Sequence, residues 1–169
     1  SPATPVISTA EKPVYFYIES AANGTVLFRD GINNNLLGNL LYAPTNSEGV
    51  QLKHDLMATI TGAGISLDNA LWQIVKEGGI DKLKNKGTGL VIADARFGKT
   101  TNTNNFIAEA LNAEYAPNSQ YRLRNSNQPS PGVAWYSAAN GNYIDRWSSS
   151  APNSQVAWYF IVAPGSEGY

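Results

Sequence analysis

The stretch Asp68-Asn69-Ala70-Leu71-Trp72-Gln73-Ile74-Val75 decides the fold when it is read together with the stretch that follows it. In the first stretch, Trp72 stands in an apolar run that begins directly after the turn sequence Asp68-Asn69. The next stretch is Lys82-Leu83-Lys84-Asn85-Lys86-Gly87-Thr88-Gly89-Leu90-Val91-Ile92-Ala93-Asp94. It alternates between apolar and polar residues, turns through two glycines and returns as an apolar run. This pattern predicts two half-buried strands joined by a hairpin turn.

Degraded copies of this unit occur three times along the chain. Gly24, Gly89 and Gly132 align, and each stands between an alternating strand and an apolar strand. The strands before them end in Ile18-Glu19-Ser20, Leu83-Lys84-Asn85 and Leu123-Arg124-Asn125. A single four-stranded unit cannot bury its apolar face, whereas three units close a barrel with a hairpin cap. We therefore predict an all-β chain, a β-trefoil of three repeats.

The first repeat is longer than the others. Leu83 and Leu123 are 40 residues apart, whereas 65 residues separate Ile18 from Leu83, so an insertion is expected at residues 31–66. Residues 50–57 fit a short helix or a strand, and the strand is preferred. The predicted domain covers residues 14–163, and its repeats are expected at 14–79, 80–119 and 120–163.

The two ends of the chain differ from the predicted domain in composition. Residues 1–13 and 164–169 are expected to be linkers, since proline, glycine and serine recur in them. We interpret the chain as a module from a longer secreted protein that has other domains. Residues 106–115 contain an Ala-Glu-Ala-Leu run of helical propensity, but the all-β frame favours a strand.

Composition narrows the classes of function. The 169 residues suit one domain, and charged residues make up only 15% at a net charge of −1. The polar surface must therefore come from Asn, Ser, Thr and Gly, beside four Trp, nine Tyr and five Phe, which suits sugar hydroxyls. The sequence has no stripe of Lys and Arg residues, so nucleic-acid binding is not expected. No apolar run approaches the length of a membrane-spanning helix. Without cysteine there are no disulfides or thiolate metal sites, and we expect no metal and no cofactor.

The sequence resembles the ricin-B-like β-trefoil lectins and carbohydrate-binding modules over residues 14–162. The resemblance rests on the strand–Asn–turn–Gly–strand units and on the two tryptophan runs at residues 69–72 and 155–158. Residues 143–147 look like the family's third strand. In the trefoil pattern the two tryptophan runs would be inward strands, so Trp72 and Trp158 are expected in the core.

The family's Gln-x-Trp signature is not intact. Ala70 and Val156 stand two residues before the two tryptophans, and the second repeat has Asn112 where tryptophan is expected.

The resemblance also implies where sugar would bind. In this family a site pairs an acidic residue after the second strand with an aromatic platform and an Asn or Gln. The carboxylate accepts charge-assisted hydrogen bonds from sugar hydroxyls, and the ring packs on the apolar face of the sugar. Carried over, the pattern points to Asp30 and Asp94 in the first two repeats and to Asn69 as a further ligand. In the third repeat it points to Asn140, Tyr143, Asp145 and Trp147.

Each of these residues has a structural alternative. Asp30 and Asp94 would cap turns, and Asp68-Asn69 is an ordinary turn sequence. Trp135 and Trp147 could each be either a core residue or an aromatic platform for a sugar.

Catalytic interpretations have less support. His54 is the only histidine and is read as a surface or packing residue rather than a base. There is no Gly-x-Ser-x-Gly elbow and no cluster with metal-ligand spacing. A glycosidase needs two placed carboxylates, and nothing selects a pair among Asp94, Glu109, Glu114 and Asp145.

We therefore predict a non-catalytic carbohydrate-binding module of a secreted or cell-surface bacterial protein, with a glycan as partner. It would be attached to a larger protein, such as a glycan-acting enzyme. The altered Gln-x-Trp signature favours an alternative, a trefoil for protein–protein contact or adhesion with decayed sugar sites. A small hydrolase built on the insertion is a third hypothesis.

Overall fold

The computed structural model describes residues 2–21, 38–94, 96–111, 120–128, 134–137, 141–147 and 156–166. Twelve of its strands form three sets of four. The first set is β2 (Phe16–Ser20), β3 (Leu40–Tyr42), β5 (Lys53–Asp55) and β6 (Leu71–Glu77). The second is β7 (Ile80–Asn85), β8 (Val91–Asp94), β9 (Phe97–Lys99) and β10 (Phe106–Ala110). The third is β11 (Gln120–Asn125), β12 (Ala134–Ser137), β13 (Ile144–Trp147) and β14 (Ala157–Val162).

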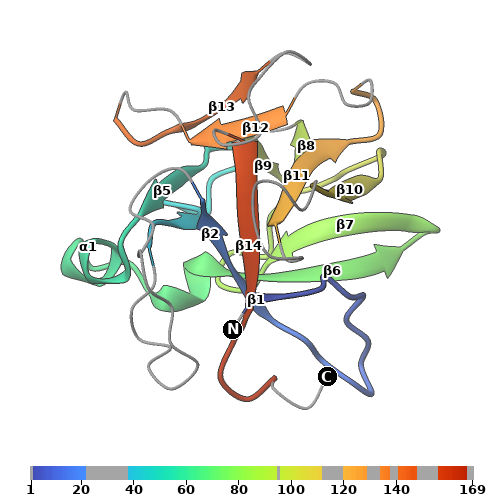
Figure 1. Cartoon of the computed structure of the whole chain (residues 1–169), viewed down its shortest axis with the longest axis horizontal. Coiled ribbons are helices and arrows are strands. Elements are labelled where there is room, and N and C mark those ends of the chain that lie inside the picture. Colours follow the sequence, from blue (N-terminus) through green and yellow to red (C-terminus); the bar gives the residue numbers. More distant parts are fainter. Residues whose placement is uncertain are drawn as a thin grey trace.

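The first and last strands of each set form a barrel. They pair in the order β10-β11-β14-β2-β6-β7, with antiparallel neighbours. At the remaining seam β7 and β10 are in contact, and the Asn105 Oδ1 atom accepts the backbone N–H of Asp81 at 2.9 Å. The middle strands pair as the hairpins β3–β5, β8–β9 and β12–β13, which lie at the upper end of the barrel in Figure 1. The predicted all-β trefoil is confirmed.

Equivalent positions in the three repeats can be assigned from strand register. Trp72 lies opposite Asn85, Phe106 opposite Asn125, and Trp158 opposite Ser20. The alignment of the three polar strand ends is therefore confirmed, whereas Gly24 and Gly132 lie outside the described residues.

The aromatic position of the second repeat is Phe106, which is 5% exposed, rather than position 112. From the sequence, this aromatic position was expected at Asn112, which lies outside the described residues. That expectation was wrong, because a constant step of 40 residues ignores the shorter connections in this repeat.

The main core fills the barrel. Trp72 and Trp158 are each 1% exposed and belong to it, as predicted. The indole N–H of Trp72 donates to the carbonyl of Leu41 at 2.9 Å, so the largest core side chain also satisfies its polar atom. Residues 106–110 form a strand rather than a helix, because Phe106 packs into this core while Glu109 faces outward.

The surplus of the first repeat builds a second apolar cluster outside the barrel. Between β5 and β6 the chain forms α1 (Met57–Gly62) and the 3-10 turn η1 (Leu67–Ala70). Ile60 of α1 and Ala70 of η1 pack with Tyr17 and Ile161, which point outward from β2 and β14. This cover explains why all five residues of β2 are buried. The strand preference for residues 50–57 holds for β4 (Val50–Gln51) and β5 but not for Met57, where α1 begins.

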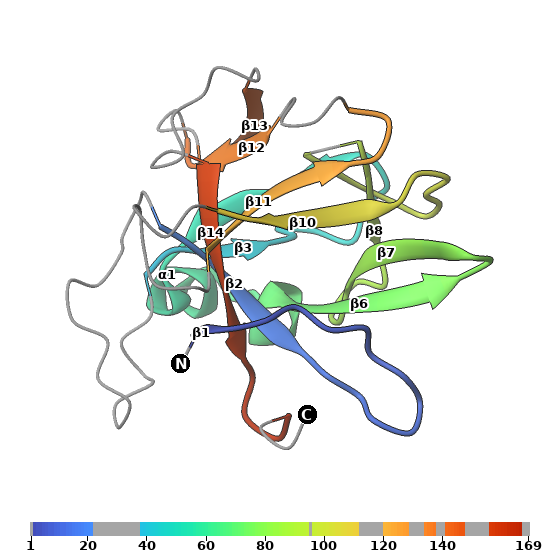
Figure 2. The same ribbon diagram turned by 45° about the vertical axis from the view of Figure 1, so that its right-hand side comes forward.

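Residues 2–14, the N-terminal strap, belong to the barrel and are not the linker that was predicted. Strand β1 (Pro2–Ala3) pairs with β14, and Ile7 forms a parallel bridge to Ile74 of β6. The N–H of Ser8 donates to the Ile74 carbonyl at 2.7 Å. Figure 2 shows the strap running from the foot of β14 to β6 before it enters β2. Among the described residues, strand β11 pairs only with residues 157–159 of β14, so β1 can pair with Phe160 and Ile161, and Ala3 and Val6 pack against the core. Composition alone does not reveal this attachment.

The chain after β14 also returns to the barrel. The Ser166 hydroxyl accepts the backbone N–H of Tyr15 at 3.1 Å, and Ser166 is buried. Residues 164–166 are thus held against β2, contrary to the linker expectation. The other predicted domain and repeat limits remain predictions.

Replacing Ser8 with alanine should lower the free energy of unfolding by about 1–3 kcal/mol, because a buried backbone donor would lose its partner. The Ser8 hydroxyl oxygen accepts the N–H of Val14 at 2.9 Å and the Gln73 side-chain N–H at 3.0 Å. Urea unfolding measures the change. Thr4→Ala, at an exposed position of the same strap, is the control and should be neutral. Equal effects of the two substitutions would contradict the role given to Ser8.

Candidate functional site

Two of the predicted sugar ligands lie together on the hairpin cap. Tyr143 directly precedes β13 and Asp145 lies within it, and Ile144 between them is fully buried. Because side chains alternate along a strand, Tyr143 and Asp145 both point away from the core. Tyr143 is 41% exposed and the Asp145 side chain 40%. The third repeat thus presents an aromatic ring and a carboxylate on one outward face.

The Tyr143 ring is held by two neighbours. The Nζ atom of Lys53, on β5 of the first repeat, lies 5.2 Å from the ring centroid. On the chain itself, a Cβ atom at Gly141 would lie 3.1 Å from the Tyr143 Cδ2 atom, so the ring packs closely on this glycine. The ammonium–ring contact is a cation–π interaction. It limits how much of the ring a ligand can cover.

Asp145 is oriented by its own contacts. Its Oδ1 atom accepts hydrogen bonds from the Arg96 Nη1 atom at 2.5 Å and from the backbone N–H of Arg146 at 2.8 Å. The Oδ2 atom makes no hydrogen bond to a described residue. Arg96 lies in the β8–β9 turn, with its guanidinium 4.7 Å from the centre of the Phe97 ring. One carboxylate oxygen is therefore fixed, while the other is not engaged by any described residue.

A buried polar cluster lies behind Tyr143. Asp55 of β5 is 8% exposed, and its Oδ2 atom accepts the Tyr42 hydroxyl while Oδ1 accepts the Asn142 side-chain N–H at 2.8 Å. Burial, and then the hydrogen bond to Asp55, raise the pKa of Tyr42 well above its usual range. Tyr42 therefore remains protonated and donates to the carboxylate.

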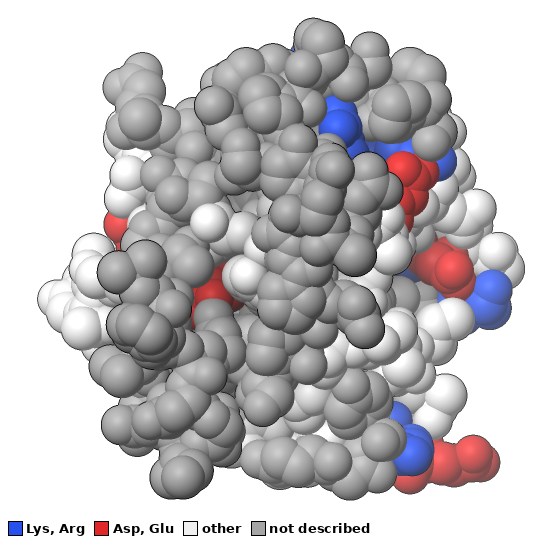
Figure 3. Space-filling model, in the orientation of Figure 1, with Lys and Arg blue, Asp and Glu red and all other residues white. Residues whose placement is uncertain are grey.

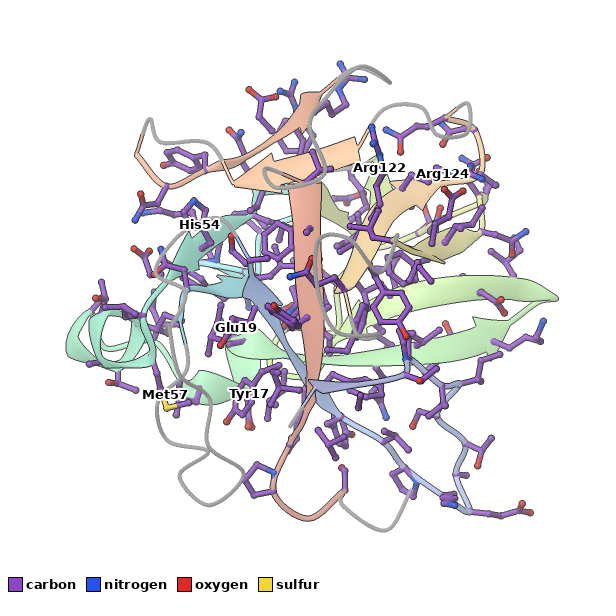
Figure 4. All side chains as sticks on the ribbon, viewed as in Figure 1. Tyr17, Glu19, His54, Met57, Arg122 and Arg124 are labelled. Atoms are coloured by element: carbon purple, nitrogen blue, oxygen red, sulfur yellow. The ribbon has the colours of Figure 1, made fainter. Side chains whose placement is uncertain are left out.

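His54 belongs to the same strand and is a packing residue, as one of the two readings proposed. It is 1% exposed, and its Nδ1 atom lies 2.9 Å from the Asn39 Nδ2 atom. Figure 4 shows His54 on β5, on the opposite side of β14 from Arg122 and Arg124. A base would need access to substrate, which this burial denies.

Asn69 has the structural role that was the alternative to sugar binding. Its Nδ2 atom donates to the Ala43 carbonyl at 2.9 Å, and its own carbonyl accepts the Asn85 side-chain N–H at 2.8 Å. Its Oδ1 atom lies against Gly87. The amide nitrogen is thus engaged within the turn, and the amide oxygen is packed against Gly87.

The remaining predicted ligands have no described side chain. Asp30 and Asn140 lie outside the described residues. Asp94 ends β8 and Trp147 ends β13, where only their backbone is described, and the same holds for Trp135 on β12.

Sequence reasoning missed Lys53, Arg96, Asp55 and Asn142. Arg96 is 49 residues from Asp145, and Asp55 is 87 residues from Asn142, so no local motif joins them. The only sequence signal for any of them was the alternation of apolar and polar residues at 50–57, which indicated a strand containing Lys53 and Asp55.

The described surface carries charges of both signs. In Figure 3 acidic and basic residues lie next to one another along the right-hand side of the face, whereas the acidic residues on the left have no basic neighbour in view. On the β6–β7 hairpin Lys76 pairs with Asp81 at 3.1 Å, and on β10–β11 Arg124 pairs with Glu109 at 2.7 Å. Burial lowers the pKa of Arg122, and Glu109 partly opposes this shift. Such paired charges fit a neutral polyhydroxylated ligand better than a phosphate chain.

In the described part of the chain, no group of three or more His, Asp or Glu side chains is placed to hold a metal ion. No helix among these residues is long and apolar enough to cross a membrane.

No protein-family model and no curated protein sequence matches the chain. Solved structures do share its fold. The Rhizoctonia solani agglutinin superposes with a TM-score of 0.59 at 14% identity, covering 96% of this chain and 100% of the agglutinin. The BEL β-trefoil superposes with a TM-score of 0.58 at 14% identity, covering 94% of this chain and 98% of the BEL chain.

Larger proteins contain a similar domain. A GlcNAcα1-4Gal-releasing endo-β-galactosidase from Clostridium perfringens matches with a TM-score of 0.58 at 14% identity, over 89% of this chain. A mosquitocidal holotoxin matches with a TM-score of 0.60 at 14% identity, over 88% of this chain. The match spans 32% of the enzyme and 17% of the toxin. The chain therefore has the β-trefoil fold that its repeats and its resemblance predicted.

Proposed function

We propose that the chain is a non-catalytic carbohydrate-binding module and that Tyr143 and Asp145 form its glycan site in the third repeat. The observation that carries this proposal is an exposed ring beside a carboxylate with one fixed oxygen and one that no described residue engages. The ring edge and exposed face suit the apolar C–H surface of a sugar, and Oδ2 suits its hydroxyls. The fold shared with an agglutinin and with part of an endo-β-galactosidase supports this proposal.

The remaining predicted ligands extend the proposal to the whole trefoil. Asn140 and Trp147 would complete the site in the third repeat, and Asp30 and Asp94 would serve related sites in the other two. Asn69 has the least support because its amide is engaged in the turn. Weak binding at each site would be strengthened by multivalency.

We further propose that the module belongs to a secreted or cell-surface bacterial protein with other domains. Similar domains occupy only a part of the endo-β-galactosidase and of the holotoxin, which supports a module within a larger chain.

Alanine at Tyr143 or Asp145 should weaken glycan binding about tenfold, or about 1.4 kcal/mol, because Tyr143 would lose ring packing and Asp145 a hydrogen bond to a charged acceptor. A glycan array identifies the ligand of the wild-type chain, and calorimetry then compares the variants. Asp68→Ala is the matched control, because Asp68 is an exposed carboxylate paired with Lys86 in the first repeat. Unchanged binding by both site variants, with the wild type bound, would contradict this placement of the site.

The second candidate function is protein contact through a trefoil with decayed sugar sites. Two observations favour it: Lys53 already covers part of the Tyr143 ring, and the Gln-x-Trp signature is altered. A wild-type chain that binds no glycan class, yet binds a protein surface equally well after Asp145→Ala, would support this alternative.

A further inference from the structure

The segment that carries Tyr143 is joined edge to edge with the first repeat. The backbone N–H of His54 donates to the Asn142 carbonyl at 2.9 Å, and the Ile144 N–H donates to the Leu52 carbonyl at 2.9 Å. Between these two bonds, Lys53 forms an antiparallel bridge with Tyr143. The position of the aromatic ring therefore depends on how the hairpins of the first and third repeats dock.

Asn142 has an unusual backbone conformation at this junction. Its φ is +58°, and it is the only non-glycine residue with a positive φ in the part of the chain that the structure describes. Asparagine tolerates this left-handed region better than most residues, but glycine adopts it at no steric cost. Backbone strain of this kind persists where surrounding contacts hold it, and it clusters at functional sites.

Asp55 provides the contact that holds Asn142. Its carboxylate lies between two hairpins, with Oδ1 accepting from the Asn142 side chain and Oδ2 accepting from Tyr42 of β3. Both partners donate to a charged acceptor in a buried place, where such bonds are strong. The turn before β13 is thus tied by a side chain as well as by the backbone.

We propose that Asp55 and Asn142 are positioning residues that hold Tyr143 in its binding orientation. This inference rests on the proposed function. It adds that a contact between the first and third repeats, from Asp55 to Asn142, orients the ring before a glycan binds. Gly141 on one side of the ring and Lys53 over it restrict the ring further. A ring fixed before the ligand arrives loses less side-chain entropy on binding, which raises affinity.

Asn142→Gly separates the side-chain contact from backbone strain. Glycine adopts the positive φ without strain but has no amide to contact Asp55, so glycan binding should weaken about tenfold, and stability should fall because a buried carboxylate oxygen loses its donor. Asn142→Ala removes the same amide and adds backbone strain, so it should lose the same contact and still more stability. Asp55→Asn keeps the volume of the side chain and should weaken binding to a smaller degree. Calorimetry and urea unfolding measure the two properties.

A second readout does not depend on any glycan. With 3-fluorotyrosine incorporated in the full chain, the ¹⁹F resonance of residue 143 is assigned by its loss in Tyr143→Phe. In Asn142→Gly this resonance should shift or broaden, whereas the resonance of Tyr121 in the barrel core should not.

The outcomes distinguish this inference from the proposed function. Glycan binding and a ¹⁹F resonance that both match wild type in Asn142→Gly would overturn the positioning role and leave the proposed function intact. If the wild-type chain binds no glycan, the proposed function fails, and the ¹⁹F resonance then decides alone whether Asn142 positions Tyr143.

Discussion

Trp72→Ala is expected to lower the free energy of unfolding by about 3–5 kcal/mol, the range for removing a large aromatic side chain from a packed core. Trp72 is 1% exposed and belongs to the main core. The substitution also leaves the Leu41 carbonyl without the indole donor. Because such a loss is a large fraction of the stability of a domain, part of the protein would unfold at physiological temperature.

Trp72→Phe is the informative control. The second repeat has Phe106 at the matching barrel position, so the fold accommodates a phenyl ring there. The expected cost is about 1–3 kcal/mol, mainly for the lost hydrogen bond to a buried carbonyl. Urea unfolding of the three proteins measures the series. A phenylalanine variant as unstable as the alanine variant would contradict the equivalence of the two positions.

Gly87→Ala is expected to destabilise the chain by about 3 kcal/mol or more, at the upper end for overpacking, because the new methyl group meets fixed backbone. A Cβ atom at Gly87 would lie 2.8 Å from the Asn69 nitrogen and 2.9 Å from the Asp68 carbonyl carbon, with the Asn69 Oδ1 atom also in the way. The glycine is held in this place by its N–H, which donates to the Asp68 carbonyl at 3.0 Å. The clash would separate the turn after β7 from η1 and expose the end of the barrel.

Gly62→Ala provides the matched control for this prediction. Gly62 lies in α1, its φ is not positive, and an added Cβ atom meets nothing within 4 Å. Alanine there should be neutral or stabilising by up to about 1 kcal/mol, because it favours the helix. Thermal unfolding of both variants suffices. A Gly87→Ala protein as stable as Gly62→Ala would show that the turn relaxes easily, contrary to this account.

The candidate site was predictable only in part. The resemblance placed Tyr143 and Asp145 in one strand, and the structure brings both to one outward face. Their partners Lys53 and Arg96 belong to the other two repeats, and sequence spacing carries no information on how hairpins dock. For the same reason Asn69 was a ligand candidate, whereas its contacts to Ala43 and Asn85 show a turn residue.

The sequence by itself determined the strand pattern, the three-fold repeat and the burial of Trp72 and Trp158. These follow from alternation and from turn residues, which act within a few positions along the chain. The tertiary structure alone decided that Phe106 completes the aromatic set and that the N-terminal strap joins the barrel. It also decided that Asp55 holds Asn142. Those features depend on strand register and on contacts between repeats, where residues far apart in sequence share one surface.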